Sequence, residues 1–282
     1  MKRNKTIAFS LLIFSITLFG CIGDSASAVQ PSSQTQLRGT FLTVHLEVSP
    51  ESVINQAWPQ LAQIIDEANL RNFDITLMFS PQWATYVYDN DLLDTVHQWE
   101  DEGHEIALHH HGPSHAAFDG YTNDRSRLSP QPTPLRQPYQ GTMLDLIALM
   151  LPLSQRGMIS ASMTDEDVDW PAGFRFNAST PENGGPSKEG LLSSPELVNY
   201  LGQPVVQISK SGYAIERLDS TNRSVNLADI ESGLQTATPN QLMGLVINDD
   251  TLINQLDRVW DLFDLLDQYQ VQLQTLRVLL ER

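Results

Sequence analysis

The alternation of strand-like and helix-like segments constrains this chain more than any other feature. β-branched and other apolar residues fill short runs, and stretches with the apolar spacing of a helix follow them. Strands are expected at residues 41–48, 74–79, 105–109, 159–163, 205–208, 213–215 and 245–247. Helices are expected at 61–68 (with Pro59 in the first turn), 92–102, 143–153 and 252–263, and residues 271–280 close the chain. Strands separated by helices predict βαβ units and a mainly parallel sheet.

Enough such units are present for an α/β fold of the (β/α) barrel type. Functional residues in barrels gather at the carboxyl ends of the strands. This rule directs attention to Glu47, to the histidines that follow Leu108, and to residues 165–169.

The first residues have the layout of a secretory signal, with Lys2, Arg3 and Lys5 before an apolar run at residues 7–19. The run is shorter than the roughly 20 residues that span a bilayer. It ends at Gly20-Cys21, which resembles the lipobox of prokaryotic lipoproteins, and this resemblance implies a lipid on Cys21. Cleavage after residues 26–28 (Ala-Ser-Ala), which releases a soluble protein, and an uncleaved anchor are the alternatives. All three place the globular part outside the cytoplasm.

Composition then divides the chain into a signal peptide (1–20), a lipidated cysteine with a flexible tether (21–39) and one domain (40–282). The tether is rich in Ser, Gln and Ala, which suits a linker. Cys21 is the only cysteine, so no disulfide forms within the chain. The net charge is −17, and about −20 without the leader, so nucleic acid and anionic lipid are poor partners. Membrane contact is expected through the lipid anchor alone.

Five of the seven histidines lie within residues 104–115, around the end of a predicted strand. His109 and His111 share one face of that strand, and His111 and His115 are four residues apart across a Gly-Pro turn. A hydrolytic zinc site takes three protein ligands and leaves one position for water. Glu47 completes a set of two histidines and one carboxylate. A polar surface loop with incidental histidines is the alternative interpretation.

The segment from Gly103 to His109, with His111 and His115 behind it, resembles the histidine motif of the polysaccharide deacetylase family. The resemblance implies a distorted (β/α) barrel of mainly parallel strands and a metal-dependent removal of acetyl groups from sugar polymers. It also implies a divalent metal, most simply zinc, on Glu47, His115 and either His109 or His111.

The chain departs from the family pattern at three points. The paired aspartates at the end of the first strand are absent, and His45, on the same strand face as Glu47, is the nearby base. The histidine spacing is restored only by taking His111 and His115 as the pair. The late histidine of the family is replaced by Asn248. Metal binding therefore survives the comparison better than acid/base chemistry.

An acidic cluster at residues 165–169 follows another predicted strand, and Arg175 lies shortly after it. Asp165 is a second candidate base, and Arg175 is expected to orient a catalytic acid, as an arginine does in the family. A solvated loop and a calcium site are the alternatives for this cluster. The function expected is thus an exported metal-dependent hydrolase acting on carbohydrate. The alternative is an inactive carbohydrate-binding protein on the same scaffold.

Overall fold

The computed structural model describes residues 37–128, 135–179, 188–213 and 224–282. Cys21, the apolar leader and most of the expected tether lie outside these residues. The chain divides into two compact units, Met1–Ser33 and Gln34–Arg282, and only the second is described below. No helix in the described part combines the length and the apolar character needed to cross a membrane.

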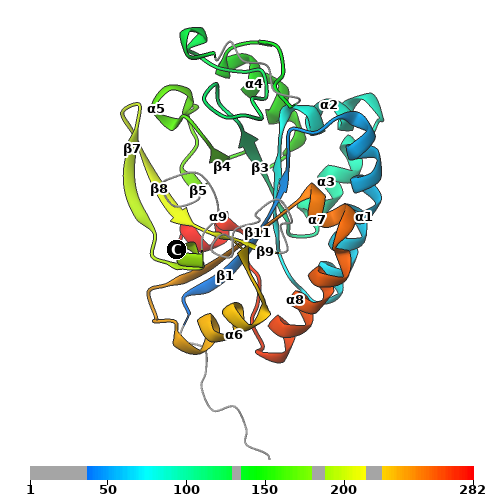
Figure 1. The fold of residues 1–282 in the computed structure, drawn as a ribbon, viewed down its shortest axis with the longest axis vertical. Helices are drawn as coiled ribbons and strands as arrows, with labels where there is room; N and C mark the ends of the chain where they lie inside the picture. Colours follow the sequence, from blue (N-terminus) through cyan, green and yellow to red (C-terminus); the bar gives the residue numbers. More distant parts are fainter. Residues whose placement is uncertain (1–36, 129–134, 180–187, 214–223) are drawn as a thin grey trace, which may run out of the picture. The chain divides into compact units, whose positions relative to one another are not determined.

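A single curled sheet organises the Gln34–Arg282 unit (Figure 1). Its strand order is β10-β9-β11-β1-β2-β3-β4-β5-β8-β7, with β6 beside β11. All pairs are parallel except β7 with β8 and β6 with β11. The strands are β1 (Gly39–Leu46), β2 (Thr76–Phe79), β3 (Glu105–His110), β4 (Ser160–Met163), β5 (Phe176–Ser179), β6 (Leu192–Ser193), β7 (Glu196–Tyr200), β8 (Gln203–Ser209), β9 (Ser211–Tyr213), β10 (Ser224–Val225) and β11 (Leu242–Asn248). The fold is therefore a distorted (β/α) barrel, as the sequence predicts.

Helices connect the successive parallel strands β1 to β5, as βαβ crossovers require. They are α1 (Glu51–Leu70), α2 (Pro81–Asp89), α3 (Leu93–Asp101), α4 (Met143–Met150), α5 (Glu166–Asp169), α6 (Leu227–Thr236), α7 (Asp249–Asn254), α8 (Leu256–Gln268) and α9 (Leu276–Leu280). Short 3₁₀ turns lie at Arg125–Arg127, Leu151–Leu153 and Lys188–Gly190. In Figure 1, α1, α7 and α8 cover one side of the sheet.

The two faces of the sheet build two separate cores. Side chains alternate along each strand, so Leu42, Val44 and Leu46 pack among the helices in the larger cluster. Phe41, on the opposite face, belongs to a second cluster inside the curl of the sheet. The other members of this inner cluster are Met78, Ala107, Ala178, Ile208, Leu242, Leu276 and Leu279.

Helix α9 closes the amino-terminal end of the barrel interior. Its Leu276 and Leu279 belong to the inner cluster, and Leu279 occupies the space that a side chain at Gly39 would need. The backbone N–H groups of Leu276 and Arg277 donate to Thr76 Oγ1 and to Glu105. Helix α9 and the buried polar group of Thr76, Glu105 and Ser160 therefore fill the amino-terminal end of the interior.

Two expectations from the sequence need correction or refinement. Pro59 does not lie in the first turn of its helix, because Pro50 takes the N-cap and α1 begins at Glu51. Pro59 lacks the backbone N–H that would donate a helical hydrogen bond. Buried apolar residues on both sides of Pro59 keep this part of α1 helical. The long helix expected at 252–263 is two helices, α7 and α8.

Candidate metal centre

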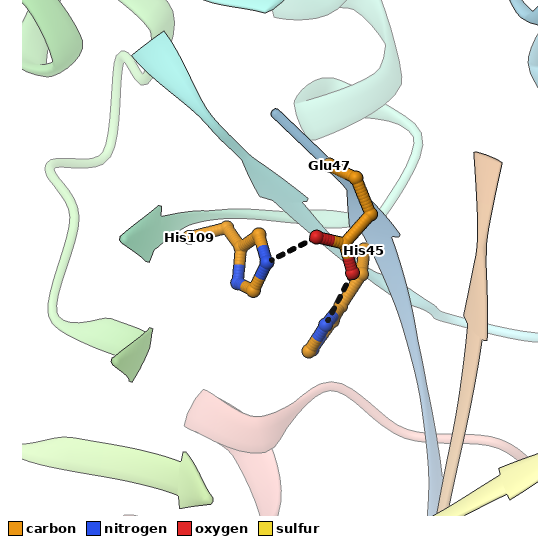
Figure 2. A group of neighbouring side chains, drawn as sticks. All are labelled: His45, Glu47 and His109. Atoms are coloured by element: carbon orange, nitrogen blue, oxygen red, sulfur yellow. Dashed lines mark hydrogen bonds and ion pairs between the residues drawn. The ribbon is translucent and has the colours of Figure 1, made fainter. Parts of the chain in front are cut away.

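The carboxyl ends of β1 and β3 bring four side chains of the inner face together. Glu47 follows β1, and its Oε2 lies 3.1 Å from His109 Nε2 and 3.3 Å from His111 Nε2. Its other oxygen, Oε1, lies 3.5 Å from His45 Nδ1. Ligand atoms of His45, Glu47 and His109 all lie within 4.8 Å of one another (Figure 2). This group joins residues more than 60 positions apart in the sequence.

Backbone carbonyls fix the rings of His109 and His111. His109 Nδ1 lies 3.2 Å from the carbonyl of Ser162, and His111 Nδ1 lies 2.9 Å from the carbonyl of Ala117. A carbonyl only accepts, so in a neutral ring Nδ1 carries the proton and Nε2 keeps its lone pair. Both lone pairs therefore belong to the nitrogens that face Glu47. Metal-binding histidines in proteins are typically held in this manner.

The spacing of these atoms fits a metal ion with imidazole and carboxylate ligands. Two ligand atoms about 2.0–2.1 Å from a tetrahedral zinc ion lie about 3.3 Å apart. Glu47 Oε2 is at 3.1 Å and 3.3 Å from the two histidine nitrogens. Imidazole nitrogen combined with carboxylate oxygen suits zinc and other divalent transition metals. Two of the three spacings in the set of Glu47, His109 and His111, those that involve Glu47, therefore fit a zinc site.

Burial and charge keep the centre in the protonation state that a metal requires. Burial, and then the neighbouring His109, lowers the pKa of His111 well below its usual value. Burial alone would raise the pKa of Glu47, but His109 and His111 outweigh it and hold that pKa well below its usual value. At neutral pH the centre therefore offers an ionised carboxylate and a neutral His111. Ligands must be deprotonated to bind.

A buried lysine that was not predicted from the sequence lies beside the centre, on the inner face of the sheet. Lys210 follows β8, is fully buried, and places Nζ 2.6 Å from His45 Nε2 and 2.9 Å from Ser162 Oγ. Burial lowers its pKa well below the usual value. One signal was available: the chain has only four lysines, and this one lies at a strand end in phase with inward-facing Ile208.

His115 lies beside the histidines of the centre, but its ring nitrogens have different hydrogen-bond partners. Its ring lies 4.0 Å from that of His111, but its Nδ1 accepts a hydrogen bond from the backbone N–H of Ala117. In a neutral ring the proton is then on Nε2, so neither nitrogen has a free lone pair. The structure therefore brings His115 near the centre, with a hydrogen-bond arrangement that differs from those of His109 and His111.

Asp165 and Arg175, the other two expected site residues, lie apart from each other. Asp165 precedes α5 and faces the 112–115 turn, where its Oδ2 accepts from the backbone N–H of Ser114. Its Oδ1 pairs with Arg127 at 3.0 Å. Arg175 stands just before β5, at the amino-terminal end of this strand, and pairs with Glu281 on the surface. The arginine beside Asp165 is thus Arg127, and Arg175 does not reach the site.

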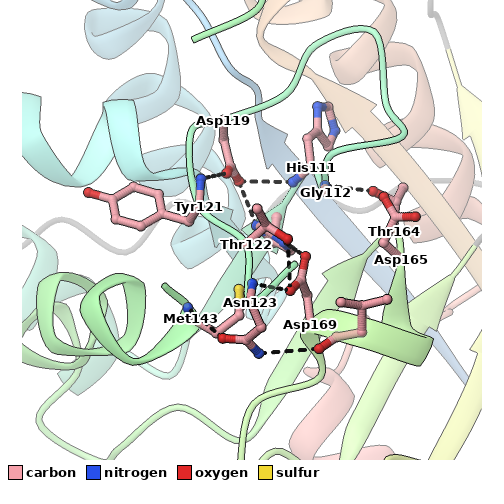
Figure 3. Close-up of polar contacts among 12 residues, drawn as sticks. His111, Gly112, Asp119, Tyr121, Thr122, Asn123, Met143, Thr164, Asp165 and Asp169 are labelled. Atoms are coloured by element: carbon pink, nitrogen blue, oxygen red, sulfur yellow. Dashed lines mark hydrogen bonds and ion pairs between the residues drawn. The ribbon is translucent and has the colours of Figure 1, made fainter. Parts of the chain in front are cut away.

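His110 belongs to a separate buried network on the outer face of β3. Its Nδ1 lies 2.8 Å from Asp119 Oδ2, and its Nε2 lies 3.5 Å from Asp169 Oδ2. Burial alone would lower the pKa of His110, but the two aspartates outweigh it and raise the pKa to about 9. Asp119 also accepts from the backbone N–H of His111, and Asp169 from that of Asn123 (Figure 3). This His110 network therefore fixes the segment that follows β3.

Several large aromatic side chains pack in the outer core. Trp83 and Trp170 are buried in the outer core, and Tyr86 is nearly so.

Comparisons with known proteins give a fold and no family. No protein-family model and no curated protein matches the sequence. Among solved structures, a 4-alpha-glucanotransferase from Thermococcus litoralis matches at a TM-score of 0.54 and 14% identity, over 87% of this chain and 40% of that one. This chain therefore spans less than half of that enzyme, and the match shows a shared fold.

Two further structures match over most of both chains. A family 4 carbohydrate esterase from Bacillus anthracis has a TM-score of 0.38 and 10% identity, over 88% of this chain and 84% of that one. The peptidoglycan deacetylase PdaC from Bacillus subtilis has a TM-score of 0.41 and 14% identity, over 90% and 93%.

Proposed function

We propose that this protein is a metal-dependent hydrolase acting on carbohydrate, and that its reaction is the deacetylation of a polysaccharide or oligosaccharide. Glu47, His109 and His111 hold the ion, which we propose to be zinc. The observation that carries the proposal is the approach of two histidine Nε2 atoms to one Glu47 oxygen, at 3.1 Å and 3.3 Å. The resemblance of residues 103–115 to the deacetylase motif supplies the substrate class.

The residues of the centre define what the site can do. A divalent metal supplies Lewis acidity and lowers the pKa of water at such a site. Ser162 and Ala117 hold the two histidine rings through their carbonyl groups, so the ligands need no rearrangement before binding. The 4-alpha-glucanotransferase that shares the fold acts, by its name, on a carbohydrate as well.

Metal analysis and acetate release test this proposal together. The purified protein is expected to bind zinc with a stoichiometry near one and to release acetate from acetylated oligosaccharides. Glu47→Gln and His111→Asn are expected to remove both properties. Ser160→Ala is the matched control, because this buried hydroxyl on the inner face of β4 pairs with Glu105 instead of the centre. A wild-type protein that stays metal-free after zinc exposure contradicts the proposal.

A second function, carbohydrate binding without turnover, has a specific observation in its favour. The two candidates for the catalytic base are both engaged: His45 contacts Glu47 and Lys210, and both Asp165 oxygens accept hydrogen bonds. Asn248, at the position of the late histidine of the family, caps α7 through Thr251. Oligosaccharide binding without acetate release, in a zinc-loaded protein, would favour this function over hydrolysis.

We further propose that the protein is exported and anchored to the cell membrane by a lipid on Cys21. The basic residues, apolar run and Gly20-Cys21 junction of the sequence support this location. Metabolic labelling with a fatty-acid analogue is expected to mark the wild-type protein and to miss Cys21→Ala. A labelled Cys21→Ala protein, or an unlabelled wild type that is secreted, contradicts the anchor.

A further inference from the structure

A buried chain of four polar side chains runs across the inner face of the barrel beside the candidate metal centre. Ser162 Oγ lies 2.9 Å from Lys210 Nζ, and Lys210 Nζ lies 2.6 Å from His45 Nε2. On its other side, His45 Nδ1 lies 3.5 Å from Glu47 Oε1. The order is therefore Ser162, Lys210, His45 and Glu47, from the carboxyl ends of three strands, β4, β8 and β1.

The lysine is unusual because no carboxylate lies within ion-pair distance of its nitrogen in the described part of the chain. A fully buried lysine is normally paired with a carboxylate. Lys210 instead contacts a ring nitrogen, a hydroxyl and, at 3.8 Å, the sulfur of Met78. An ammonium group has three N–H donors and a neutral amine has two. Both forms can donate to His45 Nε2 and to Ser162 Oγ at once.

The partners of His45 on its two sides agree on one tautomer. The ionised carboxylate of Glu47 only accepts hydrogen bonds, so the nitrogen that faces it, Nδ1, carries the proton. A neutral ring then keeps its lone pair on Nε2, where Lys210 donates. With its lone pair turned to the lysine, His45 has none left to offer a metal ion.

We propose that Lys210 is a positioning residue that holds His45 in the Nδ1–H form, so that His45 orients Glu47 and leaves Glu47 Oε2 to His109 and His111. This inference rests on the proposed metal centre for its effect on metal affinity. Its structural part, the tautomer of His45, stands without it. His45, Glu47 and His109 form one group of possible ligands. In this proposal, His45 is a hydrogen-bond partner of the ligand Glu47 and does not itself bind the metal.

Nitrogen NMR of the histidine side chains tests the structural part directly. In zinc-free wild-type protein, His45 is expected to show a protonated Nδ1 and an unprotonated Nε2, with His45→Asn identifying its signals. Lys210→Met removes the donor to Nε2, and His45 is expected to populate the Nε2–H form. A protonated His45 Nε2 in the wild type, or an unchanged tautomer in Lys210→Met, overturns the proposal.

Zinc affinity tests the consequence for the centre. Lys210→Met is expected to weaken zinc binding about 10–100-fold, the usual effect of removing a partner of a metal ligand. Ser162→Ala, which keeps the lysine but removes its second anchor, is expected to weaken zinc binding by a smaller factor. It serves as the test variant if Lys210→Met does not fold. Ser160→Ala, on the same face of β4, is expected to bind zinc like the wild type.

The two measurements separate the two proposals. A wild-type protein that binds no zinc refutes the metal centre, while the NMR experiment still decides the role of Lys210. Normal zinc affinity in both Lys210→Met and Ser162→Ala, or a direct zinc-induced shift of the His45 Nδ1 signal, overturns the positioning role even where the wild type binds zinc.

Discussion

The two faces of β3 at its carboxyl end carry the same residue type in opposite states. On the inner face, His111 meets the carboxylate of Glu47, and burial lowers its pKa well below the usual value. On the outer face, His110 lies between Asp119 and Asp169, and its pKa rises to about 9. The inner ring is neutral, and the outer ring is a structural cation.

The difference follows from the alternation of strand side chains and from the number of carboxylates on each face. Consecutive residues of a strand point to opposite sides, so His110 and His111 see different surroundings although they are neighbours in sequence. One shared carboxylate on the inner face leaves lone pairs for a metal ion. Two carboxylates on the outer face hold one protonated ring, and they also hold the backbone of the segment behind it.

The largest expected effect comes from breaking the His110 network. Asp119→Asn removes one of the two carboxylates that pair with the buried, charged His110. Loss of a partner from a buried ion pair typically lowers the free energy of unfolding by about 3–5 kcal/mol. Urea unfolding measures this loss. Asp167→Asn, an exposed carboxylate beside the same network, is the matched control and is expected to keep the unfolding midpoint. Equal midpoints for the two variants would show that the outer face holds no such charge.

The next effect is a pH dependence from His104, which precedes β3. Its Nδ1 accepts from the backbone N–H of Ile75 and its Nε2 contacts Asn69, so the ring is held neutral. Burial lowers its pKa to about 4. The unfolded chain binds this proton more readily, so the stabilisation is complete above about pH 6.5 and is lost as the pH falls toward 4.

The loss of stability expected from His104 is about 3 kcal/mol over that pH range. Unfolding free energies between pH 4 and 7 measure it in the wild type and in His104→Gln, whose amide can accept from Ile75 and donate to Asn69 without titrating. The variant is expected to show a flatter profile. Parallel profiles for both proteins would assign the acid sensitivity to other groups.

A smaller effect is expected at Gly112, where the segment after β3 passes Asp165. A side chain at Gly112 would meet Asp165 Cβ at 2.7 Å. Gly112→Ala is therefore expected to cost about 1–3 kcal/mol by overpacking. A double-mutant cycle with Asp165→Ala tests the cause, because the glycine substitution should cost less once the aspartate is shortened. An unchanged cost in that background would place the strain elsewhere.

The smallest effect sharpens the ligand assignment on the inner face. His115→Asn is expected to leave zinc affinity within about tenfold of the wild type, since its Nδ1 accepts from Ala117. His111→Asn removes a ligand and is expected to weaken zinc binding by more than about 100-fold, beyond the usual effect of an indirect partner. Calorimetric zinc titrations measure both. The reverse order would restore His111 and His115 as the ligand pair.

Much of the fold and one part of the site could be predicted from the sequence. The alternation of apolar periods is a local property, so it predicted the strands around Glu47 and His109 and the parallel sheet that joins them. The rule for strand ends then predicted that Glu47 and the histidines meet. The position of Pro59 within its helix was predicted wrongly, because the sequence around a proline in the first turn and around one in mid-helix can show the same apolar pattern.

Only the tertiary structure decided which nitrogen of each histidine faces the centre. That choice depends on hydrogen-bond partners distant in sequence, such as the carbonyl of Ser162 for His109, and no local pattern encodes them. The same holds for Lys210, which reaches His45 across 165 positions, and for Arg127, which takes the place beside Asp165 that Arg175 was expected to fill. The sequence alone determined the sheet and where polar residues collect on it, because periodicity and strand ends are local. Ligand choice and charge state arise from contacts across the fold.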